Sequence, residues 1–271
     1  AFRSSWERNG GRPKSRALSA IKRELVAELG SMASVVLLDE ELGAPAITSE
    51  LSSTVGLVMP LESQVYDSIG DGRATRLLEA FPPHRASAYG ADGCKLLLPY
   101  RPDHIPSRGS QEATVAGVIA ECTRAAMPLV LEPIVYRLPH ESEDIFRSAL
   151  PGLVAEAASR LAQLGPDVLK LQFPSGATNE LSACRAIDDA CAAVPWVLLG
   201  GGELPDVFAD QLQIAGRAGA SGFMVGRSVW EPALEPDAQL RRTRIRTICR
   251  DRLERLRAVA VASCAPLLTR R

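Results

Sequence analysis

Short apolar segments recur along the chain, and longer amphipathic segments separate them. Seven such runs are rich in Val and Leu and are bounded by Gly or Pro. They occupy residues 34–40, 55–62, 94–100, 128–136, 167–174, 195–202 and 222–230. Continuous apolar runs of this length are typical of parallel strands that are buried on both faces. The pattern therefore predicts an α/β fold.

The segments between these runs have the spacing of helices, as at residues 17–29 and 143–165. Strand and helix repeated with right-handed crossovers build either an open doubly wound sheet or a closed barrel. An eighth strand fits just upstream of the loop at residues 3–15, ending near Ala1-Phe2, and no GxGxxG motif follows an early strand. We therefore predict a (β/α)8 TIM barrel that forms a single domain over residues 1–271.

A long basic helix is predicted after the last strand, at residues 237–262. Its arginines suit either a nucleic-acid interface or a solvated face, and no aromatic residues interleave with them for base stacking. The formal net charge is −1, from 31 basic and 32 acidic residues, so no overall field attracts nucleic acid or an acidic membrane. We predict a solvated face and no nucleic-acid partner. The residues expected to face inward are Leu240, Ile245, Ile248, Leu253 and Leu256.

Composition excludes further classes of protein. No apolar run approaches the roughly 18–20 residues that span a bilayer, and the chain shows no charged-then-apolar secretory leader. We therefore expect no membrane partner and a cytoplasmic protein. The three histidines are scattered and the six cysteines form no CxxC pair. Neither a disulfide framework, nor a metal site, nor a cofactor is predicted.

Three of the apolar runs each contain one charged residue. Lys170 lies in the middle of DVLKLQFP, and the two preceding runs contain Lys95 and Glu132. A buried amine loses its hydration, which costs several kcal/mol unless it is neutralised or paired. If all three side chains face inward, two amines and one carboxylate meet in a space of low dielectric.

This combination has a direct chemical use. A neutral lysine attacks a ketone, but a free lysine with a pKa of ~10.4 is almost wholly protonated at neutral pH. Desolvation and a nearby cation favour the neutral form, so Lys95 could supply that cation for Lys170 while Glu132 shuttles protons. A structural ion pair between Glu132 and either lysine is the alternative interpretation.

Glycines near the ends of the last two runs predict an anion site. Gly200, Gly201 and Gly202 end the run at 195–202, and Gly226-Arg227 lies in the run at 222–230. Glycines let backbone N–H groups approach an oxyanion, and an arginine can grip it through two hydrogen bonds. Loops after the last two strands are the usual phosphate site of such barrels. We therefore expect Gly201, Gly202, Gly226 and Arg227 to bind a substrate phosphate.

Further polar residues lie near the strand ends or in the loops beyond them. Gln172 shares a strand face with Lys170 and is a possible substrate contact, as are Arg3, Arg101 and Arg137. No individual role is assigned to the remaining strand-end residues, which are Asp39, Glu62, Tyr100 and Tyr136.

Six segments together resemble the tagatose 1,6-bisphosphate aldolase family, which includes the bacterial sulfofructose phosphate aldolases. They are VVLLDEELGAP, GCKLLLPYRPD, PLVLEPIVY, DVLKLQFP, PWVLLGGG and GASGFMVGRSVW, in order over about residues 17 to 260. The resemblance implies a (β/α)8 barrel that cleaves ketose phosphates through a Schiff base without metal. It implies that Lys170 is the Schiff-base lysine, Glu132 the acid/base and Lys95 the lysine of the K-[LF]-L motif. It places the phosphate at Gly201, Gly202, Gly226 and Arg227.

The resemblance departs from the family pattern near the start of the chain. The family usually shows Asp-x-Arg-[Gly/Ser]-Ser after the first strand, whereas AFRSSW keeps Arg3-Ser4-Ser5 without an aspartate before them. The chain also opens without Met. Either this protein lacks the aspartate, or residues are missing from the sequence.

The expected function is a class I aldolase that cleaves a ketohexose 1-phosphate to dihydroxyacetone phosphate and a three-carbon aldehyde. The sequence leaves open whether that aldehyde is phosphorylated, from a bisphosphate, or sulfonated, from sulfofructose 1-phosphate. The alternative is a catalytically weak barrel that binds a sugar phosphate and acts as a regulatory or interaction protein. The resemblance also implies a homo-oligomer.

Overall fold

A computed structural model describes residues 2–8 and 15–267 of the chain. It divides into two compact units, each built from three stretches of chain. The first unit comprises Ala1–Met59, Gly200–Ala209 and Val225–Ala258. The second comprises Pro60–Leu199, Asp210–Met224 and Val259–Arg271. The expectation of a single domain stays a prediction.

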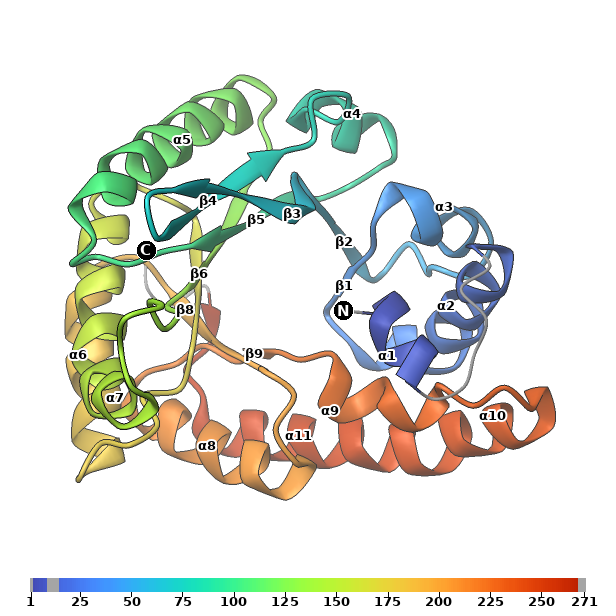
Figure 1. The fold of residues 1–271 in the computed structure, drawn as a ribbon. Coiled ribbons are helices and arrows are strands. Elements are labelled where there is room, and N and C mark those ends of the chain that lie inside the picture. Colours follow the sequence, from blue (N-terminus) through green and yellow to red (C-terminus); the bar gives the residue numbers. More distant parts are fainter. Residues whose placement is uncertain (1, 9–14, 268–271) are drawn as a thin grey trace. The chain divides into compact units, whose positions relative to one another are not determined.

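The second unit is built on parallel strands in the order β5-β6-β7-β8-β9. Their bounds are β5 Gly93–Pro99, β6 Leu129–Ile134, β7 Val168–Leu171, β8 Trp196–Leu199 and β9 Phe223–Met224. Helices α5 (Ile105–Arg124), α6 (Glu143–Ala162) and α7 (Glu180–Cys191) form the crossovers between successive strands from β5 to β8 (Figure 1). Each helix is long enough to return the chain to the start of the next parallel strand. The carboxyl ends of β5, β6 and β7 therefore lie at the same edge of the sheet.

Strand register decides which side chains share a face. Lys95 lies opposite Val130, and Leu131 opposite Leu169. Because side chains alternate along a strand, Lys95, Glu132 and Lys170 point to the same side of the sheet. The intervening residues Leu96, Leu98, Leu131 and Leu169 are fully buried on the other side.

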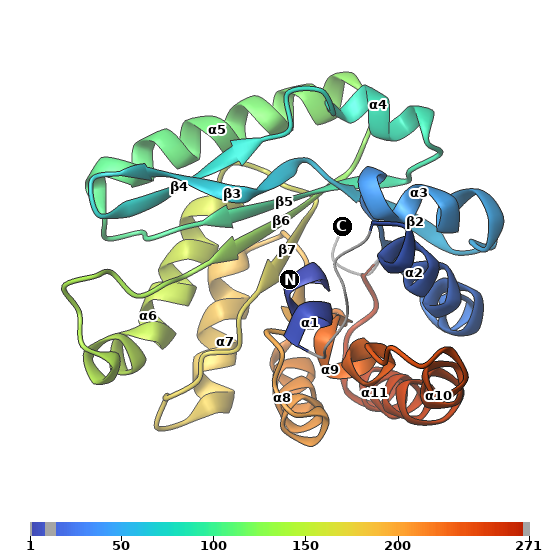
Figure 2. The ribbon, with the colours of Figure 1, turned by 45° about the vertical axis from the view of Figure 1, so that its right-hand side comes forward.

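A β-hairpin precedes β5 and was not predicted. Strands β3 (Glu62–Ile69) and β4 (Gly72–Leu77) pair antiparallel, with an irregularity in register between Glu62 and Tyr66. Gly70 has φ +63° at the turn, a conformation that favours glycine. Strand β4 contacts both β5 and α5 (Figure 2). The sequence shows no apolar run here because much of the hairpin is solvent-exposed.

The first unit pairs two parallel strands, β1 (Val35–Leu37) and β2 (Gly56–Pro60), the last residue of which belongs to the second unit. The other early elements are α1 (Phe2–Arg8), α2 (Ser15–Leu29), η1 (Gly30–Met32) and α3 (Glu40–Ser49). Asp39 caps α3 by accepting a hydrogen bond from the Leu42 N–H at 2.7 Å. Helix α4 (Pro83–Ala88) lies in the second unit, and α8 (Pro205–Ala218) begins in the first unit and ends in the second.

The seven predicted runs each contain one parallel strand, so the α/β fold class is confirmed. The prediction of a strand ending near Ala1-Phe2 is wrong for Phe2, which begins helix α1. Its ring packs edge-on against Trp230, with centroids 5.1 Å apart.

The predicted basic helix consists of α10 (Ala238–Arg244), a π-helical turn η3 (Ile245–Cys249) and α11 (Arg250–Ser263). It follows α9 (Arg227–Trp230) and η2 (Glu231–Ala233). Ile245, Leu253 and Leu256 are buried as predicted. The prediction is wrong for Leu240 and Ile248, which are exposed. Ile248 lies in the π turn, whose additional residue shifts the buried face. Leu240 precedes that turn, in α10.

The described residues contain neither a membrane-spanning helix nor a group of side chains that could bind a metal ion. Among residues 2–8 and 15–267, no helix combines the length and apolar character that crossing a bilayer requires. The same residues contain no group of three or more His, Cys, Asp or Glu side chains that could hold a metal ion.

Candidate active site

Four buried ionisable side chains form a continuous chain of contacts in the second unit. Lys170 Nζ lies 2.8 Å from Glu132 Oε1, and Lys95 Nζ lies 3.4 Å from Glu132 Oε2. Lys95 also forms an ion pair and hydrogen bond with Glu62 Oε1. The charges thus alternate as Glu62, Lys95, Glu132, Lys170. We call these four residues the charge cluster.

The cluster is almost completely removed from solvent. The exposed fractions are 5% for Glu62, 4% for Lys95, 6% for Glu132 and 8% for Lys170. The Leu97 N–H donates to Glu62 Oε2 at 3.2 Å, so both oxygens of that carboxylate are bound. Buried charges persist only when they are paired in this way.

Three strands and the hairpin bring the cluster together. The predicted residues Lys95, Glu132 and Lys170 come from β5, β6 and β7, whose register places them side by side. Glu62 is the first residue of β3, next to the irregularity that separates it from the regular part of the hairpin. In the sequence, Glu62 lies at the end of a predicted strand and has no assigned role. The distance of 33 residues between Glu62 and Lys95 left no local signal of their contact.

Burial and neighbouring charges set opposite protonation tendencies at the two carboxyls. Burial raises the pKa of Glu132, but the ammonium groups of Lys170 and Lys95 outweigh it and hold the pKa below the usual range. Burial raises the pKa of Glu62 beyond what Lys95 offsets, and the negative charge of Glu132 adds to the rise. Burial lowers the pKa of Lys95, but the two carboxylates outweigh it and leave the pKa above the usual range. The two carboxylates therefore favour the charged form of Lys95.

The arrangement can perform acid–base and nucleophilic chemistry. Glu132 lies within hydrogen-bond distance of the Lys170 amine, the distance required of a base that takes a proton from it. A lysine in such a site can attack a carbonyl carbon once it is neutral. A structural ion pair alone would not require a second lysine and a second carboxylate in the same space.

Gln172 lies on the loop-side end of β7 and binds protein backbone. Its Oε1 accepts a hydrogen bond from the Val135 N–H at 2.6 Å, and its Nε2 donates to the Val135 carbonyl at 3.4 Å. The side chain therefore ties the segment after β6 to the segment after β7. It holds the loops that border the charge cluster.

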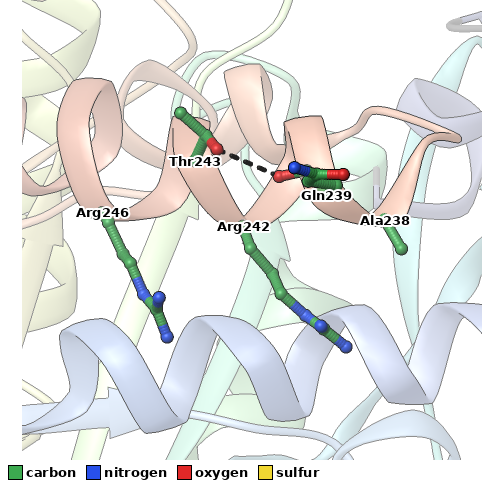
Figure 3. A pocket seen from close by; sticks show the side chains of 5 residues that line it. All are labelled: Ala238, Gln239, Arg242, Thr243 and Arg246. Carbon is green, nitrogen blue, oxygen red and sulfur yellow. Dashed lines mark hydrogen bonds between the residues drawn. The ribbon is translucent and has the colours of Figure 1, made fainter.

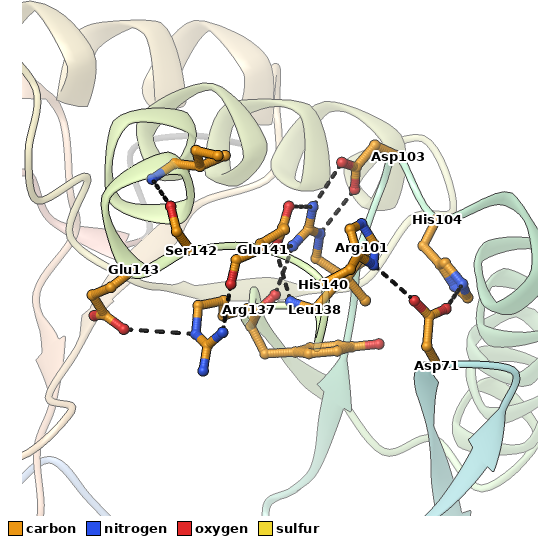
Figure 4. A network of polar contacts seen from close by, with 12 residues as sticks. Asp71, Arg101, Asp103, His104, Arg137, Leu138, His140, Glu141, Ser142 and Glu143 are labelled. Carbon is orange, nitrogen blue, oxygen red and sulfur yellow. Dashed lines mark hydrogen bonds and ion pairs between the residues drawn. The ribbon is translucent and has the colours of Figure 1, made fainter.

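Arg101 was expected to be a possible substrate contact, and the structure places it in a buried network (Figure 4). Its guanidinium pairs with both oxygens of Asp103 and both oxygens of Glu141, at 2.6–2.8 Å. The remaining donor reaches the Tyr136 carbonyl at 2.9 Å. All five N–H donors of an arginine are thus in use, and none remains for a ligand. Arg101 joins the β5–α5 loop to the β6–α6 loop.

Arg137 and Arg3 lie elsewhere. Arg137 is exposed, donates to the Glu141 carbonyl at 2.6 Å and lies 3.6 Å from Glu143 (Figure 4). Arg3 lies in α1 of the first unit, and its side chain is outside the described part of the structure. A role in substrate binding stays a prediction for both.

The expected phosphate-binding residues come together in the first unit. Arg227 donates a hydrogen bond to the Gly201 carbonyl. Gly202 has φ +107°, and a methyl group added there would lie 2.6 Å from the guanidinium carbon of Arg227. The Ser228 hydroxyl is buried and has no partner among the described residues. An arginine held against glycine backbone suits an oxyanion.

Two side chains, those of Glu203 and Trp230, occupy space beside the glycines of the expected anion site. The Glu203 carboxylate lies close to Gly201, since a methyl group there would be 2.7 Å from Glu203 Oε1. Gly226 lies beside Trp230, whose indole nitrogen would be 3.0 Å from an added methyl group. The binding of a phosphate by these residues stays a prediction.

A separate cavity of about 520 Å³ lies along α10 and η3 (Figure 3). It is lined by Ala238, Gln239, Arg242, Thr243 and Arg246. Arg242 lies 3.4 Å from Glu24 and Arg246 lies 2.6 Å from Glu28, so both cations are already paired. None of the candidate site residues lines this cavity, and we assign it no ligand.

Comparison with known proteins places the chain in a family. Residues 13–232 match the model of the DeoC/LacD family aldolases. Tagatose 1,6-diphosphate aldolase of Lactococcus lactis is 27% identical over 92% of this chain and 84% of its own length. Tagatose 1,6-diphosphate aldolase of Staphylococcus epidermidis is 28% identical over 87% of this chain and 80% of its own length.

Solved structures agree on the fold. An archaeal fructose-1,6-bisphosphate aldolase, captured with its catalytic lysine bound to the carbinolamine intermediate, aligns with a TM-score of 0.61 and 19% identity, covering 89% of this chain and 83% of that one. The fructose-bisphosphate aldolase of Slackia heliotrinireducens aligns with a TM-score of 0.63 and 19% identity, covering 89% and 76%. The fold is therefore TIM-barrel-like. With the family match over most of its length, the chain belongs to the DeoC/LacD family of aldolases and is a carbon–carbon lyase.

Proposed function

We propose that this aldolase cleaves a ketohexose 1,6-bisphosphate into dihydroxyacetone phosphate and a three-carbon aldehyde phosphate, with Lys170 as the Schiff-base lysine. The observation that carries the assignment is the 2.8 Å contact between the buried Lys170 amine and the Glu132 carboxylate. Tagatose 1,6-diphosphate and fructose 1,6-bisphosphate are the substrates named for the similar proteins, which favours a bisphosphate.

The first half of the reaction forms the Schiff base. Lys170 Nζ, in its neutral form, attacks the C2 carbonyl carbon of the ketose, and the oxygen takes up a proton to give the carbinolamine. Glu132 is placed to accept the proton that the amine loses and to return it to the C2 hydroxyl, which leaves as water. The resulting iminium is the electron sink for the next step.

The second half breaks the carbon–carbon bond. The C4 hydroxyl gives its proton to Glu132, the electrons of the C3–C4 bond move into the iminium, and the aldehyde departs from the enamine. Protonation at C3 and hydrolysis of the imine release dihydroxyacetone phosphate and return the Lys170 amine. Lys95 stays cationic throughout and can bind a substrate oxygen.

Borohydride trapping tests the assignment. The protein is incubated with dihydroxyacetone phosphate, reduced, digested and examined by mass spectrometry. The chain has only four lysines, Lys14, Lys22, Lys95 and Lys170, so the adduct can be located without ambiguity. We expect it on Lys170 alone, and we expect Lys170→Met to abolish turnover while Lys22→Met leaves it intact.

The outcomes separate the two candidate functions. An unmodified Lys170 at saturating ligand would make the cluster structural and favour a protein that only binds a sugar phosphate. Turnover of fructose or tagatose bisphosphate should exceed turnover of sulfofructose 1-phosphate. The reverse ratio would reassign the substrate to the sulfonated sugar and leave the Schiff base in place.

A further inference from the structure

Glu62 is the member of the charge cluster that the proposed mechanism does not use. Its carboxylate is 5% exposed, it binds Lys95, and it comes from the hairpin rather than from the parallel strands. Glu132 is shared by Lys95 and Lys170, so Glu62 is the second carboxylate that brings the ionised cluster to a net charge of zero. A buried acid at the end of a row of hydrogen-bonded groups therefore calls for a physical account.

The charge cluster has two protonation states with a net charge of zero. With every group ionised, two carboxylates and two ammonium groups sum to zero. A second arrangement also sums to zero, in which Glu62 is protonated and Lys170 is neutral. The two arrangements differ by one proton, moved from Lys170 to Glu62. Buried clusters favour a net charge of zero, and both arrangements meet this condition.

The contacts offer a path for that proton. Lys170 can pass a proton to Glu132 across 2.8 Å, and Glu132 can pass one to Lys95 across 3.4 Å. Lys95, which donates a hydrogen bond to Glu62, gives up one of its own protons in exchange. After these three transfers Glu132 and Lys95 are unchanged, Glu62 carries one more proton, and Lys170 carries one fewer.

We propose that Glu62 stores the proton that Lys170 loses when it becomes a nucleophile, so that the amine is activated within the buried cluster. This inference rests on the proposed function of Lys170. It makes Glu62 a positioning residue that acts on the reacting amine through Lys95 and Glu132.

The electrostatics of the site agree with this role. Burial raises the pKa of Glu62, whereas that of Glu132 is held low by the two lysines, so Glu62 is the better place for a stored proton. Tyr66 of β3 interacts electrostatically with Glu62, and also with Arg73 of β4. Burial raises the pKa of Tyr66, and the negative charge of Glu62 adds to the rise, so the phenol stays neutral at the pH of the reaction.

The experiment measures how adduct formation depends on pH. Borohydride trapping of dihydroxyacetone phosphate on Lys170 is followed from pH 5 to 9 in the wild type and in Glu62→Gln. A glutamine at position 62 is always neutral, like protonated Glu62. The cluster then has zero net charge only when Lys170 is neutral, so Lys170 should be neutral down to lower pH. We expect the acid limb of the profile to move down by about one pH unit or more, the size of effect that one buried neighbouring charge exerts.

Lys95→Met should move the acid limb of the pH profile in the opposite direction. Without the intervening ammonium group, the proton on Lys170 has no route to Glu62, and Glu132 pairs with Lys170 alone. The acid limb should therefore move to higher pH, in the direction opposite to that of Glu62→Gln. A residue that merely supports the fold would lower the yield of both variants without opposite shifts.

Glu112→Gln is the matched control. Glu112 is a partly buried carboxylate on α5 that pairs with Arg160 at 2.8 Å and lies outside the charge cluster. Its profile should coincide with that of the wild type. An unshifted or upward-shifted limb in Glu62→Gln overturns the inference, provided that wild-type Lys170 is trapped. Absence of a wild-type adduct at every pH would instead remove the proposed function itself.

If Glu62→Gln does not fold, Glu62→Asp serves instead. The shorter aspartate keeps a titratable acid but moves it away from Lys95. Impaired proton transfer should then shift the limb upward, as in Lys95→Met. A wild-type profile in Glu62→Asp would count against the inference.

Discussion

Lysine and arginine are used for different purposes in this chain. Of its 31 basic residues only four are lysines, and two of these, Lys95 and Lys170, lie in the charge cluster. Arginine cannot lose its proton in a protein, whereas a buried lysine can be made neutral by its surroundings. The two lysines therefore occupy the positions where a titratable amine is useful, and arginines supply most of the other positive charges.

Glu132→Gln tests the residue that links both lysines. The amide keeps the size of the side chain but can neither accept nor return a proton. We expect kcat to fall by about 10²–10⁴-fold, the usual contribution of a positioned acid–base group. The rate of dihydroxyacetone phosphate release measures the effect, with Glu112→Gln as the control. A loss of less than tenfold would show that Glu132 is only an ion-pair partner.

At the scale of elements, the loops at the carboxyl ends of β5 and β6 are joined by one buried arginine. Arg101 binds Asp103 in its own loop and Glu141 in the next (Figure 4). The Arg101 guanidinium lowers the pKa of both carboxyls. Their contribution to stability is thus present above the ordinary values of 3.8 and 4.5, and is lost as the pH falls through the lowered pKa values.

Arg101→Leu should destabilise the protein at neutral pH. Removing one partner from a buried ion pair leaves the other charge unpaired, which costs about 3 kcal/mol. Urea unfolding should show a lower midpoint with an unchanged slope. Arg137→Leu, at the exposed neighbour, should change the free energy of unfolding by less than about 0.5 kcal/mol. Equal effects of the two variants would contradict the buried network.

The hairpin tip is held by a second set of contacts. Asp71 Oδ1 lies 2.8 Å from His104 Nε2, and Asp71 Oδ2 lies 3.0 Å from His140 Nδ1. Farther along, the Arg73 N–H donates to the Tyr136 hydroxyl at 2.6 Å, and the Thr75 hydroxyl donates to the Leu97 carbonyl at 3.0 Å. The hairpin that supplies Glu62 is thus fastened along its length.

Asp71→Asn should loosen the tip of the hairpin. Local burial raises the pKa of Asp71, but hydrogen bonds from His140 and His104 outweigh it, so the pKa is lowered from 3.8. The stabilisation is therefore present above about pH 4 and is lost as the pH falls through the lowered pKa. Amide hydrogen exchange at pH 6 should be several-fold faster in β3 and β4 of the variant and unchanged in β5. Unchanged protection of the hairpin amides would show that the contacts of Asp71 with His104 and His140 do not stabilise the hairpin.

At the scale of the whole molecule, each compact unit is assembled from three separated stretches of chain. The charge cluster belongs to the second unit, and the glycines with Arg227 belong to the first. Neither unit is a continuous segment, so neither can complete its packing before distant parts of the chain are present. The single domain over residues 1–271 stays a prediction.

Equilibrium unfolding tests that prediction. Trp196 reports on the second unit, whereas Trp6 and Trp230 report on the first. In a Trp6→Phe, Trp230→Phe variant, fluorescence follows Trp196 alone, and in Trp196→Phe it follows the other unit. We expect both variants to give urea transitions that coincide with their far-ultraviolet circular dichroism. Separate midpoints within one variant would mean that the units unfold independently.

The sequence by itself determined the seven parallel strands, the three charged residues that they carry and the aldolase chemistry. These features are local, since an apolar run, a period of two along a strand and a lysine among leucines can all be read within a few residues. Only the tertiary structure decided that Glu62 joins the cluster, that Arg101 is fully engaged within the protein, and that a π turn redirects the face of the basic helix. Those outcomes depend on residues far apart in the chain and on the removal of water from charged groups, and neither is encoded in local spacing.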